Sequence, residues 1–178
     1  MSETTHLFTS ITANYLPKAR VLAHSAKRQG ADIRFHVLLC DDYPADTERA
    51  TEPFDSIIDV EELPIPDVES WLFGHTVVEM CTAVKAMGFL EIIRRCSAEK
   101  IFYFDPDIVI MSGLEGLIDC LDQHSILLTP HQITPEQSQD AVIDNEICSL
   151  KHGVFNLGFL GVRAKGEGLQ FLNWWAER

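Results

Sequence analysis

The chain has 178 residues, of which 46% are hydrophobic and 23% charged, an ordinary composition for a globular protein. This length is typical of one domain, so we treat residues 1–178 as a single domain with its own hydrophobic core. The formal net charge of −13 argues against nucleic-acid binding through a basic surface. An anionic ligand would need a local cation, either a basic side chain or a metal ion.

The N-terminal sequence MSETTHLFTS lacks the basic region and apolar stretch of a secretory signal. No run of about 18 uncharged apolar residues predicts a membrane span. The five cysteines are scattered singly, without a CxxC pair, and this gives little support to a zinc or thioredoxin-like site. We therefore expect buried, reduced thiols in a cytoplasmic protein.

The first third of the chain predicts a strand, a helix and a second strand. Residues 6–11 (HLFTSI) predict the first strand, and residues 33–40 (IRFHVLLC) the second. Between them, residues 16–29 carry apolar side chains at steps of three and four, the spacing of an amphipathic helix. Pro17 fits the first turn of this helix, and Gly30 ends it.

The middle of the chain is less regular. A turn and a short helix follow the second strand, and residues 56–59 predict a short third strand. Residues 63–74 contain two prolines and predict an irregular loop. Residues 77–95 have the longest helical pattern in the chain.

The last part of the chain returns to alternating elements. Residues 100–104 (KIFYF) and 125–130 predict strands on either side of a helix at 113–122. Residues 131–150 are polar and predict a loop, and residues 153–163 predict a strand interrupted by glycines.

Strands that alternate with helices predict an α/β fold with a mostly parallel central sheet flanked by helices. A final helix is predicted at 168–178, and no stop signal follows Trp175. We therefore expect the chain to be truncated at its C-terminus relative to a longer parent.

The segment EKIFYFDPDIVIMSG (99–113) carries the strongest chemical signal. Asp105 and Asp107 follow a buried strand, and Pro106 between them favours extended backbone. In extended backbone, alternate side chains point to the same side, so the two carboxylates should converge. Such a pair favours a divalent cation that prefers oxygen, Mg²⁺ or Mn²⁺. The pair also falls where ligands bind in open α/β sheets, beyond the carboxyl end of a strand.

Two other interpretations of this motif stay open. Asp-Pro-Asp is common in surface turns. An Asp-x-Asp after an apolar strand also occurs in phosphatases that resemble the haloacid dehalogenases, where the first Asp is a nucleophile and a small Gly-Thr pair follows. Here Ile108 and Val109 follow, and the motif lies in mid-chain, which argues against a metal-dependent phosphatase.

Four segments, in order, resemble the nucleotide-sugar glycosyltransferases of the GT-A fold, most of all glycosyltransferase family 8 and related bacterial enzymes. They are residues 9–25, 82–93, 101–110 and 154–163. The resemblance implies a Rossmann-like, GT-A type nucleotide-sugar-binding domain. It also implies metal-assisted transfer of a hexose-like sugar from a nucleoside diphosphate sugar, a UDP-sugar most of all, to an unknown acceptor.

In the first segment, the resemblance implies that four residues border the nucleotide base and ribose: Thr12, Ala13, Asn14 and Tyr15. A strand-to-helix turn with free backbone N–H groups and an aromatic ring suits that role. Asn14 could equally cap the following helix. In the second segment, Lys85 would face the diphosphate, and the alternative is a solvated lysine.

In the third segment, the resemblance implies that Asp105 and Asp107 hold Mn²⁺ or Mg²⁺ against the donor diphosphate. In the fourth, Asn156 would hydrogen-bond to the donor sugar, and Gly158 would let the backbone approach closely. A β-bulge is the alternative role for Gly158. The family usually has a histidine as third metal ligand, but neither His131 nor His152 matches its place.

The resemblance to family 8 also implies retention of the anomeric configuration. Two alternatives to a complete enzyme remain: a non-catalytic domain that binds a nucleotide sugar or a protein partner, and the phosphatase described above. The partners we expect are a nucleoside diphosphate sugar and its acceptor. An apolar surface left uncovered by truncation would favour a homo-oligomer.

Overall fold

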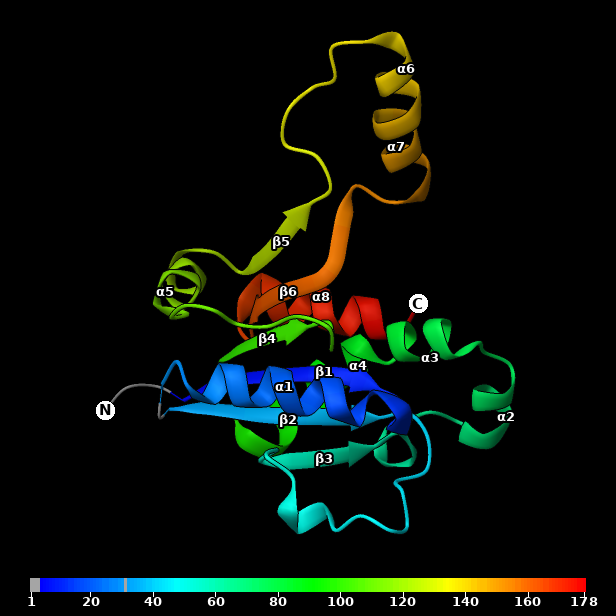
Figure 1. The fold of residues 1–178 in the computed structure, drawn as a ribbon, viewed down its shortest axis with the longest axis vertical. Coiled ribbons are helices and arrows are strands. Elements are labelled where there is room, and N and C mark those ends of the chain that lie inside the picture. Colours follow the sequence, from blue (N-terminus) through cyan, green and yellow to red (C-terminus); the bar gives the residue numbers. More distant parts are fainter. Residues whose placement is uncertain (1–3, 31) are drawn as a thin grey trace.

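The computed structural model describes residues 4–30 and 32–178. A six-stranded sheet has helices on both faces, with strand order β3-β2-β1-β4-β6-β5 (Figure 1). The strands are β1 (Thr5–Ile11), β2 (Ile33–Leu39), β3 (Ser56–Asp59), β4 (Lys100–Phe104), β5 (Ile126–Pro130) and β6 (Phe155–Arg163). β1, β2, β3 and β4 are parallel, β6 is antiparallel to β4, and β5 is antiparallel to β6. The predicted α/β fold with a mostly parallel sheet is confirmed.

The helices precede, connect and follow these strands. The α-helices are α1 (Leu16–Lys27), α2 (Val68–Phe73), α3 (Val77–Ala83), α4 (Lys85–Cys96), α5 (Glu115–Gln123), α6 (Gln139–Ala141), α7 (Cys148–His152) and α8 (Gly166–Ala176). Short 3-10 turns occur at η1 (Ala13–Tyr15), η2 (Arg49–Thr51) and η3 (Val60–Glu62), and a π-helix, η4 (Val142–Ile147), joins α6 to α7.

The alternation of side chains along the strands divides the core into two layers. Leu7 and Ile11 of β1 belong to the buried cluster that includes residues of α1 and α5, such as Leu121. Phe8, which points to the opposite face, belongs to the cluster that contains Phe89 of α4. The sheet is thus covered on both sides, as parallel sheets require.

α4 packs against β1 and β2 at Gly88, where there is no room for a side chain. A Cβ added at Gly88 would lie 2.8 Å from Cε2 of Phe8 and 3.2 Å from Cδ2 of Leu38. This close contact fixes the amino end of α4 at the carboxyl ends of β1 and β4. The chain order reverses between β1 and β4, and such a switch point is where open α/β sheets bind ligands.

Two segments predicted as loops contain helices. Within 63–74, α2 forms because its apolar side chains pack against the core cluster that contains Phe8. The prolines at 64 and 66 do not prevent this, because both precede the helix. Within 131–150, α6, η4 and the start of α7 lie in an arm that projects from the sheet between β5 and β6 (Figure 1). None of the described residues 139–152 is buried. A helix that buries no face needs no apolar stripe in its sequence, so the pattern did not predict these helices.

Two further predictions needed correction. The helical pattern at 77–95 is divided at Val84 into α3 and α4. Cys40 is buried and Cys81 is partly buried, but the other cysteines, Cys96, Cys120 and Cys148, are exposed, so buried thiols were predicted wrongly for these three. None of the described helices combines the length and apolar character needed to cross a membrane.

Candidate functional site

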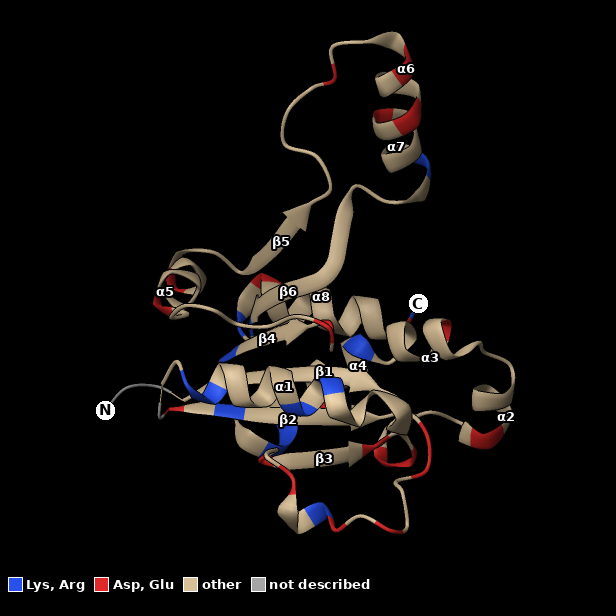
Figure 2. Cartoon of the chain, viewed as in Figure 1, with Lys and Arg blue, Asp and Glu red and all other residues tan. Residues whose placement is uncertain are grey.

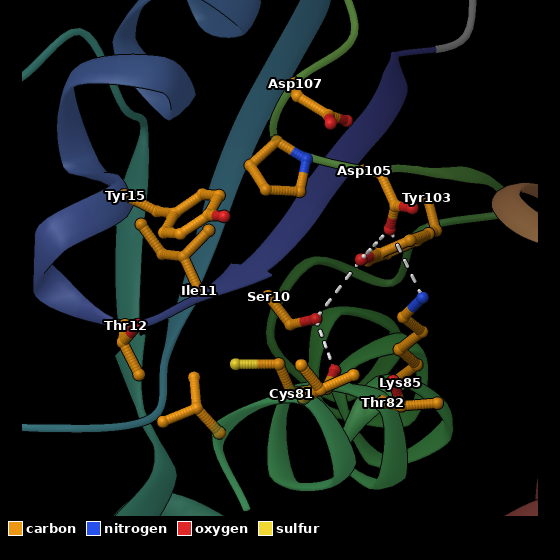
Figure 3. Close-up of a pocket in the computed structure, with 13 residues that line it drawn as sticks. Ser10, Ile11, Thr12, Tyr15, Cys81, Thr82, Lys85, Tyr103, Asp105 and Asp107 are labelled. Atoms are coloured by element: carbon orange, nitrogen blue, oxygen red, sulfur yellow. Dashed lines mark hydrogen bonds and ion pairs between the residues drawn. The ribbon is translucent and has the colours of Figure 1, made fainter.

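A cavity of about 260 Å³ opens at the switch point between β1 and β4 (Figure 3). It is lined by Ser10, Ile11, Thr12, Tyr15, Val77, Val78, Cys81, Thr82, Lys85, Tyr103, Asp105, Pro106 and Asp107. The lining comes from the carboxyl ends of two strands and from the face of α3 and α4. The cavity therefore joins three of the four segments that sequence analysis singled out.

Lys85 is the positive charge of this cavity. Its Nζ lies 3.3 Å from Oδ1 of Asp105, 3.0 Å from the carbonyl oxygen of Leu157 and 4.1 Å from the ring centre of Tyr103. Its side chain is only 8% exposed, so the alternative of a solvated lysine is wrong. Burial lowers the pKa of Lys85, and the neighbouring Asp105 opposes this effect by favouring the charged form.

Tyr103 and Ser10 connect the three elements around this ion pair. The Tyr103 hydroxyl donates to Oδ1 of Asp105 at 2.7 Å, and it lies 3.3 Å from Oγ of Ser10. Ser10 in turn donates to the carbonyl oxygen of Cys81 at 2.6 Å, which joins β1 to α3. Burial, followed by the charge of Asp105, raises the pKa of Tyr103, so the hydroxyl stays a donor.

The Asp-Pro-Asp motif forms a turn, and the expectation of extended backbone is wrong. The Ile108 N–H donates to the Asp105 carbonyl oxygen at 3.1 Å, which closes the turn over Pro106. As a result, Asp105 points toward Lys85 and Tyr103, whereas Asp107 is exposed and points in another direction (Figure 3). The two carboxylates line one cavity without converging on a single point.

The donor chemistry of this pair fits a hard divalent cation. Both side chains offer carboxylate oxygens, and the Asp105 side chain is 40% exposed, so an ion could keep several waters. Mg²⁺ is commonly bound in this way, by one or two carboxylates together with substrate phosphates. Mn²⁺ also suits carboxylate and water ligands.

The turn after β1 presents a polar edge to the cavity. Thr12 and Tyr15 line the cavity, whereas Ala13 and Asn14 are not among its described lining residues. The Thr12 hydroxyl donates to Oδ1 of Asn14 at 2.6 Å, and the Ala13 N–H donates to Oδ1 of Asp41 at 2.7 Å. Asn14 lies within η1 and Tyr15 precedes α1, so the alternative of Asn14 as N-cap of α1 is wrong.

The fourth segment meets the third through the pairing of β4 with β6. The Asp105 N–H donates to the Gly158 carbonyl oxygen at 2.8 Å, and the Gly158 N–H donates to Oδ1 of Asn156 at 2.7 Å. A Cβ at Gly158 would lie 2.8 Å from Asn156 Oδ1 and 3.0 Å from Asp105 Oδ2. The β5–β6 register also shifts here, because Leu128 faces Leu160 whereas Thr129 faces Asn156. The close approach is therefore present, and the strand pairing is irregular at this glycine.

The structure adds three polar residues that the sequence analysis did not assign: Ser10, Asp41 and Tyr103. Tyr103 could have been found, because it lies two residues before Asp105 in β4 and shares its face. Asp41 could also have been found, because it follows β2 at the carboxyl edge of the sheet. Ser10 gave no signal, since its partner Cys81 is 71 residues away in sequence.

Comparisons with known proteins show the fold that this chain shares. No protein-family description matches the chain, and no curated protein matches it. Solved structures match well: the galactosyltransferase LgtC with donor and acceptor sugar analogues aligns at 20% identity and a TM-score of 0.58, over 98% of this chain. The glycosyltransferase GlyE of Streptococcus pneumoniae TIGR4 aligns at 16% identity and 0.57, also over 98%.

A third similar structure is core-mannan synthase A of Aspergillus fumigatus in its Mn/GDP form, at 8% identity, a TM-score of 0.52 and 97% of this chain. The chain spans 60%, 37% and 63% of the lengths of LgtC, GlyE and the mannan synthase. The fold is thus that of GT-A glycosyltransferases, of which the chain covers a part.

Proposed function

We propose that this chain is the donor-binding part of a glycosyltransferase that moves a sugar from a nucleoside diphosphate sugar, with a UDP-sugar as the first choice. The observation that carries the proposal is the convergence of Lys85 and Asp105 in one cavity at the switch point of the sheet. Asp and Glu residues are spread over many parts of this chain, whose net charge is −13 (Figure 2). A buried cation beside a carboxylate that can hold a metal suits a diphosphate, which needs positive charge in such an acidic chain.

Each part of the donor has a matching group. Thr12, Ala13, Asn14 and Tyr15 would border the base and ribose, with the Tyr15 ring, 37% exposed, as a stacking surface. Lys85 would donate to the diphosphate in place of, or together with, its present contact to Asp105.

The sugar would lie toward β6, where Asn156 offers an exposed amide beside the Asp105 carboxylate. Asp105 and Asp107 would hold Mn²⁺ or Mg²⁺, and Asp107 would have to turn toward Asp105 for both to bind one ion. When bound, the metal ion would neutralise negative charge that develops on the leaving diphosphate.

A donor-hydrolysis assay tests the catalytic part of this proposal without knowledge of the acceptor. UDP release from UDP-galactose and UDP-glucose is measured with Mn²⁺ and with a chelator, on the wild type and Asp105→Asn. Asp119→Asn, an exposed change on α5, is the matched control. We expect metal-dependent UDP release that Asp105→Asn lowers at least tenfold and Asp119→Asn leaves unchanged.

The same proteins are tested on a chromogenic phosphate ester to separate the phosphatase alternative. Phosphate release that depends on Asp105, without UDP release, would overturn the proposal in favour of a phosphatase. If Asp105→Asn leaves UDP release unchanged, Asp105 does not take part in the reaction.

A further inference from the structure

We propose that His6, His36 and Cys96 form a second metal site, for Zn²⁺ or a similar borderline-soft divalent cation. Each residue offers one ligand atom, and these three atoms lie within 4.8 Å of one another. This is the group of at least three metal-ligating side chains found among residues 4–30 and 32–178. The inference is independent of the nucleotide-sugar proposal, because none of these residues lines the candidate donor cavity.

The site forms because two strands and one helix meet on the same face of the sheet. His6 lies near the start of β1, and His36 of β2 faces Phe8, two residues further along β1. Even-numbered residues of both strands point to the face that α4 covers, so the two imidazoles are diagonal neighbours. Cys96 is the last residue of α4 on that face.

The two imidazoles face each other through one nitrogen of each ring. His6 Nδ1 lies 2.9 Å from His36 Nε2, and the rings are stacked with an interplanar angle of 9°. The other nitrogen of His36, Nδ1, lies 2.7 Å from Oγ of Ser56. Such an outer hydrogen bond is the usual means by which proteins orient a ligating histidine.

Both rings are buried beneath the surface depression, His6 at 6% and His36 at 4% exposure. Their nitrogens, 2.9 Å apart, form a hydrogen bond in which one ring donates its N–H and the other accepts. A metal ion bound to these two nitrogens would replace this hydrogen bond and release its proton.

The site is open to solvent at Cys96, and the cysteine sulfur favours a softer metal ion. It is exposed and lies in the same surface depression as both histidines. Two nitrogens and one sulfur suit Zn²⁺, whereas Mg²⁺ and Mn²⁺ prefer oxygen. In a tetrahedral zinc site, ligand distances of about 2.0–2.3 Å place the donor atoms about 3.3–3.8 Å apart. The two imidazole nitrogens, 2.9 Å apart, would therefore separate slightly when an ion binds, and Cys96 would complete the set from within 4.8 Å.

The charged groups around the depression are paired with one another. Arg34 is paired with Asp55 at 2.8 Å, and Asp55 is also 2.7 Å from Lys27. Arg95 is paired with Glu91 at 2.6 Å and with Glu62 at 2.8 Å. Each of the two guanidinium groups therefore has a carboxylate partner. Three protein ligands would leave the fourth position of a tetrahedral ion to water.

The test is zinc binding to the intact chain, measured by competition with a chromophoric chelator. We expect one equivalent to bind, and Cys96→Ser to weaken the binding at least tenfold. Cys120→Ser, also exposed but on α5, is the matched control and should bind as the wild type does. With Co²⁺ in place of Zn²⁺, the wild type should show a thiolate-to-cobalt charge-transfer band that Cys96→Ser lacks.

Asp119→Asn, an exposed change on α5 that lies in neither site, should leave zinc binding unchanged. The absence of stoichiometric zinc binding would overturn the proposal. Zinc binding of equal strength in Cys96→Ser and the wild type would also overturn it, because the bound ion would then lie elsewhere.

Discussion

Lys85 Nζ lies 3.3 Å from Asp105 Oδ1, so the first residue of α4 is paired with the residue that follows β4. The lysine is 8% exposed and the aspartate 40%. The lysine therefore depends on this pair more than the aspartate does, because a buried charge without its partner is costly.

This asymmetry predicts a coupling that thermal or urea unfolding can measure. Asp105→Asn should lower the free energy of unfolding by about 1–2 kcal/mol, because it leaves the Lys85 ammonium poorly paired. In a Lys85→Met background, the same change should cost less than about 0.5 kcal/mol. Equal costs in both backgrounds would show that the pair does not stabilise the fold.

Lys85→Met should also separate recognition of the diphosphate from that of the nucleoside. If Lys85 contacts the phosphates, the variant should bind UDP about 10- to 100-fold more weakly, the range expected for a hydrogen bond to a charged group. Uridine should bind equally to the variant and the wild type. Calorimetric titration of both ligands checks this, and a parallel loss of uridine binding would contradict it.

Gly158→Ala tests the close approach of β6 to the cavity. The added Cβ would lie 2.8 Å from Asn156 Oδ1 and 3.0 Å from Asp105 Oδ2, so both side chains must move. We expect weaker Mn²⁺ binding and a loss of about 1 kcal/mol in stability. Gly116→Ala is the control, since nothing lies within 4 Å of a Cβ added at Gly116. Because alanine has a higher helix propensity than glycine, this change should stabilise α5 by up to about 1 kcal/mol.

Glu91 should stabilise the fold at neutral pH, and this stabilisation should be lost in acid. Its hydrogen bonds with Arg94, and then those with Arg95, lower its pKa from 4.5 to about 2. A lowered folded-state pKa adds stability above pH 4.5, and that stability is lost as the pH falls toward 2. The wild type should therefore exceed Glu91→Gln in stability at neutral pH, and the difference should shrink through this interval. A difference that does not vary with pH would contradict the prediction.

The arm between β5 and β6 should open more readily than the sheet. None of the described residues at 139–152 is buried, whereas every residue of β1 is. Hydrogen exchange should therefore be faster in α6, η4 and α7 than in β1, because exposed helices with few apolar contacts open locally. Equal protection of arm and sheet in the free chain would contradict this picture.

The sequence predicted most of what local patterns control. Apolar runs predicted the strands β1, β2 and β4, and the helical spacing of apolar residues predicted α1. Asp105 was found because ligands bind beyond the carboxyl ends of the strands in open α/β sheets. The arm helices escaped prediction because they bury nothing. At Pro106 the sequence left both an extended backbone and a turn open, and the turn forms, closed by the hydrogen bond from Ile108. The pairing of Ser10 with Cys81 depends on tertiary structure, which no local pattern encodes.

The most direct test of the central claim is calorimetric titration of the chain with UDP, with and without Mn²⁺. The wild type and the Asp105→Ala/Asp107→Ala double variant are compared under both conditions. We predict that Mn²⁺ strengthens UDP binding to the wild type and that the double variant loses this dependence on metal. UDP binding that is absent in both proteins, or equal in both with and without Mn²⁺, would contradict a metal-assisted nucleotide-sugar site at the end of β4.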